Sequence, residues 1–130
     1  MKRQGIITEL RFMSEVSLRE IAVSLPYGDN EKYDCITDGS ELKRVQIKST
    51  SRHETSSRLD AYNALVCHGA SNKEKYTSED CDIIAIYVIP YDAWYLIPVD
   101  EINGKTVKLY PHREGSTNKY EKWREAWSLL

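Results

Sequence analysis

The chain has 130 residues, 41% of them hydrophobic and 29% charged, which is typical of one folded domain over residues 1–130 and excludes a disordered or fibrous chain. The formal net charge of −2 excludes a surface that is basic throughout. No apolar run reaches the roughly 18 residues of a membrane span. Glu9, Arg11 and Glu15 interrupt any apolar signal segment, so we expect a cytoplasmic protein.

The first half of the chain predicts one helix followed by three strands. Over residues 4–19 apolar residues recur every three or four positions, which is a helical period; they are Ile6, Ile7, Leu10, Met13 and Val16. Residues 21–26, 32–37 and 42–50 are expected to form strands, separated by turn-forming residues at 27–30 and 38–40.

The second half predicts a loop at residues 51–57, two antiparallel strands at 82–89 and 93–99, and a short strand at 106–110. Residues 59–72 fit either a strand or a short helix. Trp123 and Trp127 stand four residues apart, which predicts a C-terminal helix over residues 119–128. A helix, a three-strand meander, a hairpin and a terminal helix together indicate an α+β fold.

Three polar features stand where packing alone does not explain them. Glu9 shares or borders the apolar stripe of the helix, where a carboxylate is costly unless it is paired or coordinated; alternatively, it lies at the edge and reaches solvent. Asp34 stands within a predicted strand, where aspartate is disfavoured. Alternation puts Gln46 and Lys48 on one face of the next strand, and pairing through the turn brings Asp34 beside them. An amphipathic strand with its polar side in water also fits.

Such a set suits metal-assisted hydrolysis of a phosphodiester, which needs a divalent cation to polarise the phosphoryl oxygen and to acidify a water molecule. The oxygens of Asp34, of the Gln46 side chain and of the Ile47 carbonyl favour Mg²⁺, with Mn²⁺ as a substitute. Lys48 can orient the nucleophilic water or stabilise charge on the scissile phosphate. Glu9 can bind the metal, directly or through water, or hold Lys48 in place.

Glu9 on the helix, the pair Tyr33-Asp34 and the run Val45-Gln46-Ile47-Lys48-Ser49 resemble the core of the PD-(D/E)xK nucleases. A narrower likeness is to a small subfamily that includes a group I intron homing endonuclease of a cyanobacterium. It rests on LPYGDNEKYD at 25–34, DIIAIY at 82–87 and WYLIP at 94–98.

The resemblance implies a restriction-endonuclease-like core, in which an N-terminal helix precedes a mixed central β-sheet with a C-terminal helix. It also implies a Mg²⁺-dependent endodeoxyribonuclease. Its catalytic residues would be Glu9, Asp34, Gln46 and Lys48, and its metal ligands Glu9, Asp34, Gln46 and Ile47. Gln46 stands where such nucleases often carry an acid, so we expect weaker metal binding.

The residues that directly follow Lys48 are expected to contact the DNA backbone, namely Ser49, Thr50, Ser51, Arg52 and His53. Residues 43–75 hold seven basic side chains against three acidic ones, which favours a polyanionic partner, although a solvated surface explains the same excess. A domain of this size reads a long site on double-stranded DNA more easily as a homo-oligomer, a dimer or a tetramer.

Three cysteines without a C-x-x-C pair predict reduced thiols and no disulfide scaffold. A zinc site would need His53, His68 or His112, at spacings that match no ligand pattern, so we expect none.

Homing, restriction-type and Holliday-junction-resolving nucleases share this core, and the subfamily likeness favours a homing-like enzyme. Gln46 leaves open a DNA-binding module that has lost turnover.

Overall fold

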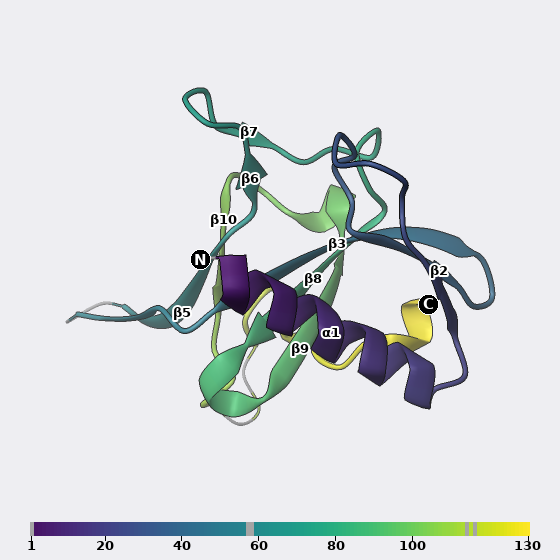
Figure 1. Ribbon diagram of the computed structural model, residues 1–130. Coiled ribbons are helices and arrows are strands. Elements are labelled where there is room, and N and C mark those ends of the chain that lie inside the picture. The colour runs from purple at the N-terminus through teal and green to yellow at the C-terminus, as the bar shows by residue number, and fades with distance from the viewer. Residues whose placement is uncertain (1, 57–58, 114, 116) are drawn as a thin grey trace.

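The computed structural model describes residues 2–56, 59–113, 115 and 117–130, and it places one α-helix against a five-stranded sheet (Figure 1). The helix α1 spans Lys2–Leu18, close to the predicted bounds. The central sheet has the order β1-β2-β3-β8-β9, with strands Ala22–Ser24, Cys35–Asp38, Leu42–Thr50, Ile83–Val88 and Ala93–Pro98. β3 and β8 are parallel and the other neighbours are antiparallel, so the predicted mixed sheet and α+β class are confirmed.

A second sheet has the order β10-β5-β4, formed by Thr106–Leu109, Asp60–Leu65 and His53–Thr55. Two short strands, β6 (Cys67–His68) and β7 (Glu74–Lys75), pair with each other. The described part of the chain also contains four 3₁₀ turns, namely η1 (Ile89–Tyr91), η2 (Val99–Glu101), η3 (Glu121–Trp123) and η4 (Trp127–Leu129).

The expected loop at residues 51–57 is wrong at 53–55, because these residues pair with β5; residue 57 lies outside the described residues. The ambiguous residues 59–72 contain strands and no helix among those that the structure describes.

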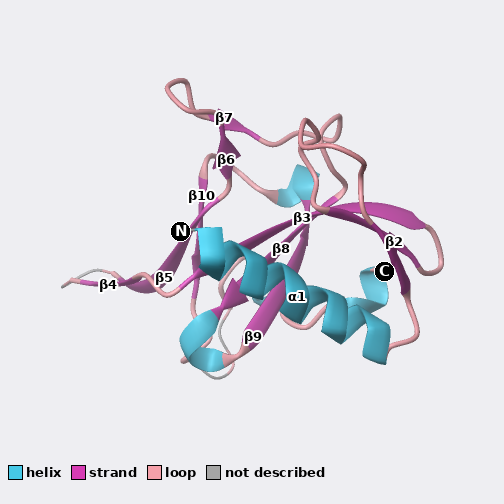
Figure 2. Ribbon diagram, in the orientation of Figure 1, coloured by secondary structure: helices cyan, strands magenta, loops and turns pink. Residues whose placement is uncertain are grey.

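The central sheet is covered on both faces, because α1 lies across one face (Figure 2) and the second sheet packs on the other. Alternate residues of β8 therefore enter two different cores. Ala85 belongs to the cluster that holds Phe12 of α1, whereas Ile84 and Ile86 belong to the cluster that holds Tyr62 of β5. Burial on both faces explains why β8 is apolar at every position.

The buried face of α1 differs from the predicted apolar stripe. Thr8, Phe12 and Val16, spaced four residues apart, are buried against the sheet. Three residues of the predicted stripe are exposed instead, namely Ile6, Ile7 and Leu10. Glu9 lies next to the buried row and is half-buried, so it borders the core as the sequence suggested.

The helix α1 ends without the glycine that often caps a helix. Glu20 adopts the left-handed conformation, with φ 61°, in which glycine is usual. The amides of Ile21 and Glu20 donate to the carbonyls of Val16 and Ser17, 3.0 Å away in each case, and this pattern closes the helix.

The predicted C-terminal helix over residues 119–128 is wrong. η3 and η4 are single 3₁₀ turns, interrupted at Glu125, which has φ 50°. The Glu125 amide donates to the Trp94 carbonyl over 2.7 Å, and its carboxylate accepts from the Trp94 amide over 2.7 Å. Arg124 also pairs with Tyr95 as a β-bridge. Bonds to the free edge of β9 thus replace the helical bonds that the tryptophan spacing suggested.

Within the residues that the structure describes, no helix has the length and apolar character needed to cross a membrane. Cys35 and Cys81 are buried free thiols and Cys67 is a half-buried one, as predicted.

Candidate active site

Asp34 stands directly before β2, and the backbone of β3 holds it in place. Its amide donates to the carbonyl of Val45 over 2.8 Å, and its Oδ2 accepts from the amide of Ile47 over 2.8 Å. The register pairs Cys35 with Val45, so Asp34 stands directly before the paired strand and beside the segment of β3 that carries Gln46. The carboxylate is therefore held in one orientation by the backbone of the strand that carries Gln46 and Lys48.

Lys48 brings a positive charge into the same neighbourhood. Its Nζ lies 5.3 Å from the centre of the Tyr76 ring, and the Asp34 charge acts on it electrostatically. Burial lowers the pKa of Lys48, and the negative charge of Asp34 partly counteracts this effect. A partly desolvated ammonium interacts more strongly with a nearby anion than one in bulk water.

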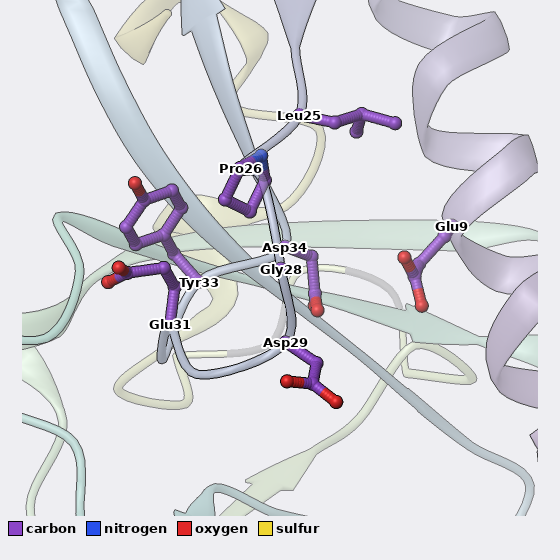
Figure 3. A pocket seen from close by; sticks show the side chains of 8 residues that line it. All are labelled: Glu9, Leu25, Pro26, Gly28, Asp29, Glu31, Tyr33 and Asp34. Atoms are coloured by element: carbon purple, nitrogen blue, oxygen red, sulfur yellow. The ribbon is translucent and has the colours of Figure 1, made fainter.

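Glu9 and Asp34 line one opening of about 310 Å³, together with Asp29 and Glu31 (Figure 3). The Glu9 side chain enters from α1 and faces the Asp34 side chain across this opening. Burial raises the pKa of Glu9, and the charge of Asp34 raises it further. Burial also raises the pKa of Asp34, although the Ile47 amide and Lys48 act in the opposite direction. Negative charge is thus concentrated where it is poorly solvated.

The donor set fits a hard divalent cation. Carboxylate, amide and carbonyl oxygens are the ligands that Mg²⁺ prefers, and two carboxylates with raised pKa values gain from a cation between them. Gln46 is half-buried, and its Nε2 lies 3.5 Å from the Ile47 carbonyl oxygen, so the amide and this carbonyl are neighbours. Glu9, Asp34, Gln46 and Ile47 are the residues that would hold the ion.

The residues after Lys48 line a second depression, of about 460 Å³, which contains Ser49, Thr50, Ser51 and Arg52 beside Lys48. Within this group Thr50 is buried, and its hydroxyl donates to the Asn63 carbonyl. Ser49 accepts a hydrogen bond of 3.0 Å from Gln4 of α1. Arg52 is exposed and forms an ion pair of 3.2 Å with Glu54. The depression therefore extends from Lys48 to the exposed guanidinium of Arg52.

His53 lies elsewhere, on β4, where its ring stacks on Tyr62 and its Nε2 lies 2.6 Å from Asp60. The structure thus does not bring it to the depression that the four preceding residues line.

A model of the family described as PD-(D/E)XK endonuclease matches residues 1–130 of this chain. The chain belongs to this family. Among solved structures it is similar to a bacterial homing endonuclease, I-Ssp6803I, with 25% sequence identity and a TM-score of 0.82. That match covers 99% of this chain and 91% of the other. A search of curated proteins gives no match. The predicted resemblance, the core fold and the nuclease function are confirmed.

In this PD-(D/E)XK endonuclease, the sequence pattern missed two neighbours of the candidate site. Asp29 stands in the turn before β2 and lines the opening with Glu9 and Asp34, although its turn signal gave it only a structural role. Tyr76 is buried, its ring lies beside the Lys48 ammonium, and burial raises its pKa to about 12.

Asp82, which heads the segment DIIAIY, has a structural role in this endonuclease. Its Oδ2 accepts hydrogen bonds from the amide and the Nε of Arg44, at 2.8 and 3.2 Å. Its Oδ1 lies 3.1 Å from Nη2 of the same guanidinium. The pair joins the start of β3 to the residue before β8, and so helps to align the strand that carries Lys48.

Proposed function

We propose that this nuclease is a Mg²⁺-dependent endodeoxyribonuclease of the homing type, and that it acts in the cytoplasm on double-stranded DNA. The observation that carries the proposal is the convergence of Glu9, Asp34 and Lys48, where two carboxylates with raised pKa values share a site with one partly desolvated ammonium. The likeness to a bacterial homing endonuclease over 99% of the chain supports the homing type.

Glu9, Asp34, Gln46 and Ile47 are proposed to hold Mg²⁺, which would polarise the phosphoryl oxygen and acidify a water molecule. The Ile47 amide fixes one oxygen of Asp34 and leaves the other for a cation. Lys48 is proposed to stabilise charge on the scissile phosphate, because it shares one face of β3 with Gln46 and its ammonium interacts with the Asp34 charge. Asp29 adds negative charge to the opening, which offsets the neutral Gln46.

The DNA is proposed to approach along the depression beside Lys48. Ser49, Ser51 and Arg52 line it, so that their hydroxyl and guanidinium groups suit phosphate oxygens. Thr50 would position this segment rather than contact DNA, because its buried hydroxyl is bonded to Asn63. His53 is proposed to contact DNA only at the far end of the segment. Its ring stacks on Tyr62 and its Nε2 contacts the Asp60 carboxylate.

A homo-oligomer is proposed from the outer face of α1. Ile6, Ile7 and Leu10 are 58%, 47% and 60% exposed, respectively, and they form a contiguous apolar surface on one helix face. Ile7 also lines a depression with Tyr87 and Ile89. We expect Leu10→Glu to yield a smaller species in sedimentation equilibrium, whereas Leu65→Glu, an exposed leucine of the second sheet, leaves the assembly unchanged. Equal masses for all three proteins would contradict a contact through α1.

Incubation with genomic DNA, followed by sequencing of the cut ends, tests the nuclease proposal. We expect cut ends that share one long sequence when Mg²⁺ or Mn²⁺ is present and no cutting in EDTA. A parallel reaction contains a four-way junction and a supercoiled plasmid. Preferred cutting of the junction would indicate a resolvase, and frequent cutting of the plasmid at short sites a restriction-type enzyme. If the protein binds its natural site without any cutting, the nuclease proposal is wrong and the protein is a DNA-binding module.

A further inference from the structure

A second cluster of metal-ligating side chains lies on the smaller sheet, outside the candidate active site. His53, Asp60 and His112 offer ligand atoms that all lie within 4.8 Å of one another. Asp60 stands between the two rings: its Oδ1 lies 2.6 Å from Nε2 of His53, and its Oδ2 lies 3.1 Å from Nε2 of His112. Both imidazoles therefore present the same nitrogen to one carboxylate.

The register of the sheet explains why residues so far apart in sequence meet. β5 is the middle strand, and its Tyr62 pairs with His53 of β4 on one side and with Leu109 of β10 on the other. Asp60 stands two residues before Tyr62 and therefore on the same face. His112 follows shortly after β10, which brings the chain back over that face.

Aromatic contacts hold the two imidazoles in place. The His53 ring stacks on Tyr62 with centres 4.5 Å apart, and the His112 ring meets Tyr62 at 5.6 Å and 72°. The two histidine rings are 5.5 Å apart at 65°. Rings packed in this way lose little freedom when they coordinate an ion, so the cluster is largely preorganised.

His112 supplies the observation that points to a ligand. Its side chain is only 16% exposed, and both ring nitrogens are buried. Neither nitrogen forms a hydrogen bond to a residue that the structure describes, although Nε2 lies 3.1 Å from Oδ2 of Asp60. Buried polar atoms without partners are rare, and a coordinated ion would give Nε2 its partner.

The ligand set selects the class of ion. Two imidazole nitrogens and one carboxylate oxygen suit Zn²⁺ and its transition-metal neighbours, whereas Mg²⁺ prefers oxygen ligands. The Asp60 carboxylate presents one oxygen to each imidazole, so the three side chains already face a common point. Arg113, 3.6 Å from Oδ2 of Asp60, is half-exposed and can turn into solvent.

We infer that His53, Asp60 and His112 bind one transition-metal ion of the Zn²⁺ class, apart from the proposed Mg²⁺ site. The ion would join β4, β5 and the segment after β10. β4 carries His53, the last residue of the proposed DNA-contacting segment, so the ion would also fix the end of that segment. The inference does not depend on nuclease activity, since it concerns a different sheet and a different ligand set.

Titration of the metal-free 130-residue protein with Zn²⁺, followed by calorimetry, tests the inference. The protein carries Asp34→Asn, so that the candidate active site lacks one charged ligand. We expect one ion per chain, and a Kd that rises about tenfold or more in His53→Gln and in His112→Gln. The matched control is His68→Gln, because His68 also faces an aspartate, with its Nε2 3.8 Å from Asp80, and it should bind as the parent does.

Substitution of Co²⁺ for Zn²⁺ gives a second readout. We expect visible absorption bands of a low-symmetry nitrogen and oxygen site, without the intense near-ultraviolet charge-transfer band of a thiolate ligand such as Cys67. Zn²⁺ should also raise the melting temperature of the parent protein and not that of His53→Gln. If His112→Gln does not fold, His53→Gln still tests the metal site. The His53 side chain is 38% exposed, so its replacement should leave the fold intact. Absence of binding, or binding unchanged in His53→Gln, would overturn the inference.

Discussion

Replacing Lys48 with methionine is expected to lower the rate of DNA cleavage by about 10²–10³-fold while DNA affinity changes little. The proposed role of the ammonium is to stabilise charge that develops only in the transition state, so its loss affects the chemical step more than binding. Methionine keeps the length of the stem and its contact with Tyr76, and it removes a charge that is partly desolvated. The fold should therefore persist. Single-turnover cleavage at saturating Mg²⁺, beside a binding titration, measures the two effects separately.

Lys43→Met is the matched control for this substitution. Lys43 lies on the same strand, but its Nζ pairs with the exposed carboxylate of Glu41 at 3.0 Å. The substitution removes an equal charge at a distance from the candidate site, and cleavage should remain within a few-fold of the parent. Equal losses in both variants would indicate that net charge matters rather than the position of Lys48. If Lys48→Met cleaves DNA as fast as the parent, Lys48 has no role in the chemical step.

The hairpin of β2 and β3 was predictable because its signals are local. A turn-forming Asp-Gly pair and a period of two residues suffice to pair the two strands, and the resulting register, with Cys35 opposite Val45, brings the Asp34 carboxylate to the amide of Ile47. The fold class followed from the same short-range patterns, joined by the family resemblance. These signals do not require knowledge of what packs on the sheet.

Other features depended on contacts that the sequence does not encode locally. The exposed face of α1 carries Ile6 and Leu10, so of the predicted apolar stripe only its C-terminal part, ending at Val16, faces the sheet. The C-terminal segment has a helical spacing, yet the free edge of β9 offers Trp94 as a partner for Glu125. The cluster of His53, Asp60 and His112 joins β4, β5 and the segment after β10, and the spacing of these residues in the sequence does not predict it.

Asp34→Asn is expected to reduce Mg²⁺-dependent cleavage by about a thousandfold or more, because the proposed ion loses a charged ligand. The same substitution should stabilise the metal-free protein at neutral pH. Burial raises the pKa of Asp34 in the folded state, so its ionised form opposes folding, and its charge also raises the pKa of Glu9. Asparagine is neutral and keeps an oxygen that can accept the hydrogen bond from the Ile47 amide.

The sign of the pH dependence follows from these raised pKa values. Between the ordinary and the raised pKa the folded state binds more protons than the unfolded state, so the free energy of unfolding falls as pH rises through this window. In metal-free Asp34→Asn this fall should be smaller. Urea unfolding at several pH values in EDTA measures it, and repetition with Mg²⁺ should raise the midpoint of the parent protein and not that of Asp34→Asn.

Asp82→Asn is the matched control, and it should behave in the opposite way. Burial alone would raise the pKa of Asp82, but the hydrogen bonds from Arg44 outweigh this effect and hold the pKa below its ordinary value. The ionised Asp82 therefore stabilises the fold at neutral pH, and this contribution is lost as pH falls through its folded pKa. Asp82→Asn should destabilise the protein and leave its response to Mg²⁺ intact. If Asp34→Asn destabilises the metal-free protein as well, the Asp34 carboxylate belongs to the fold rather than to a metal site.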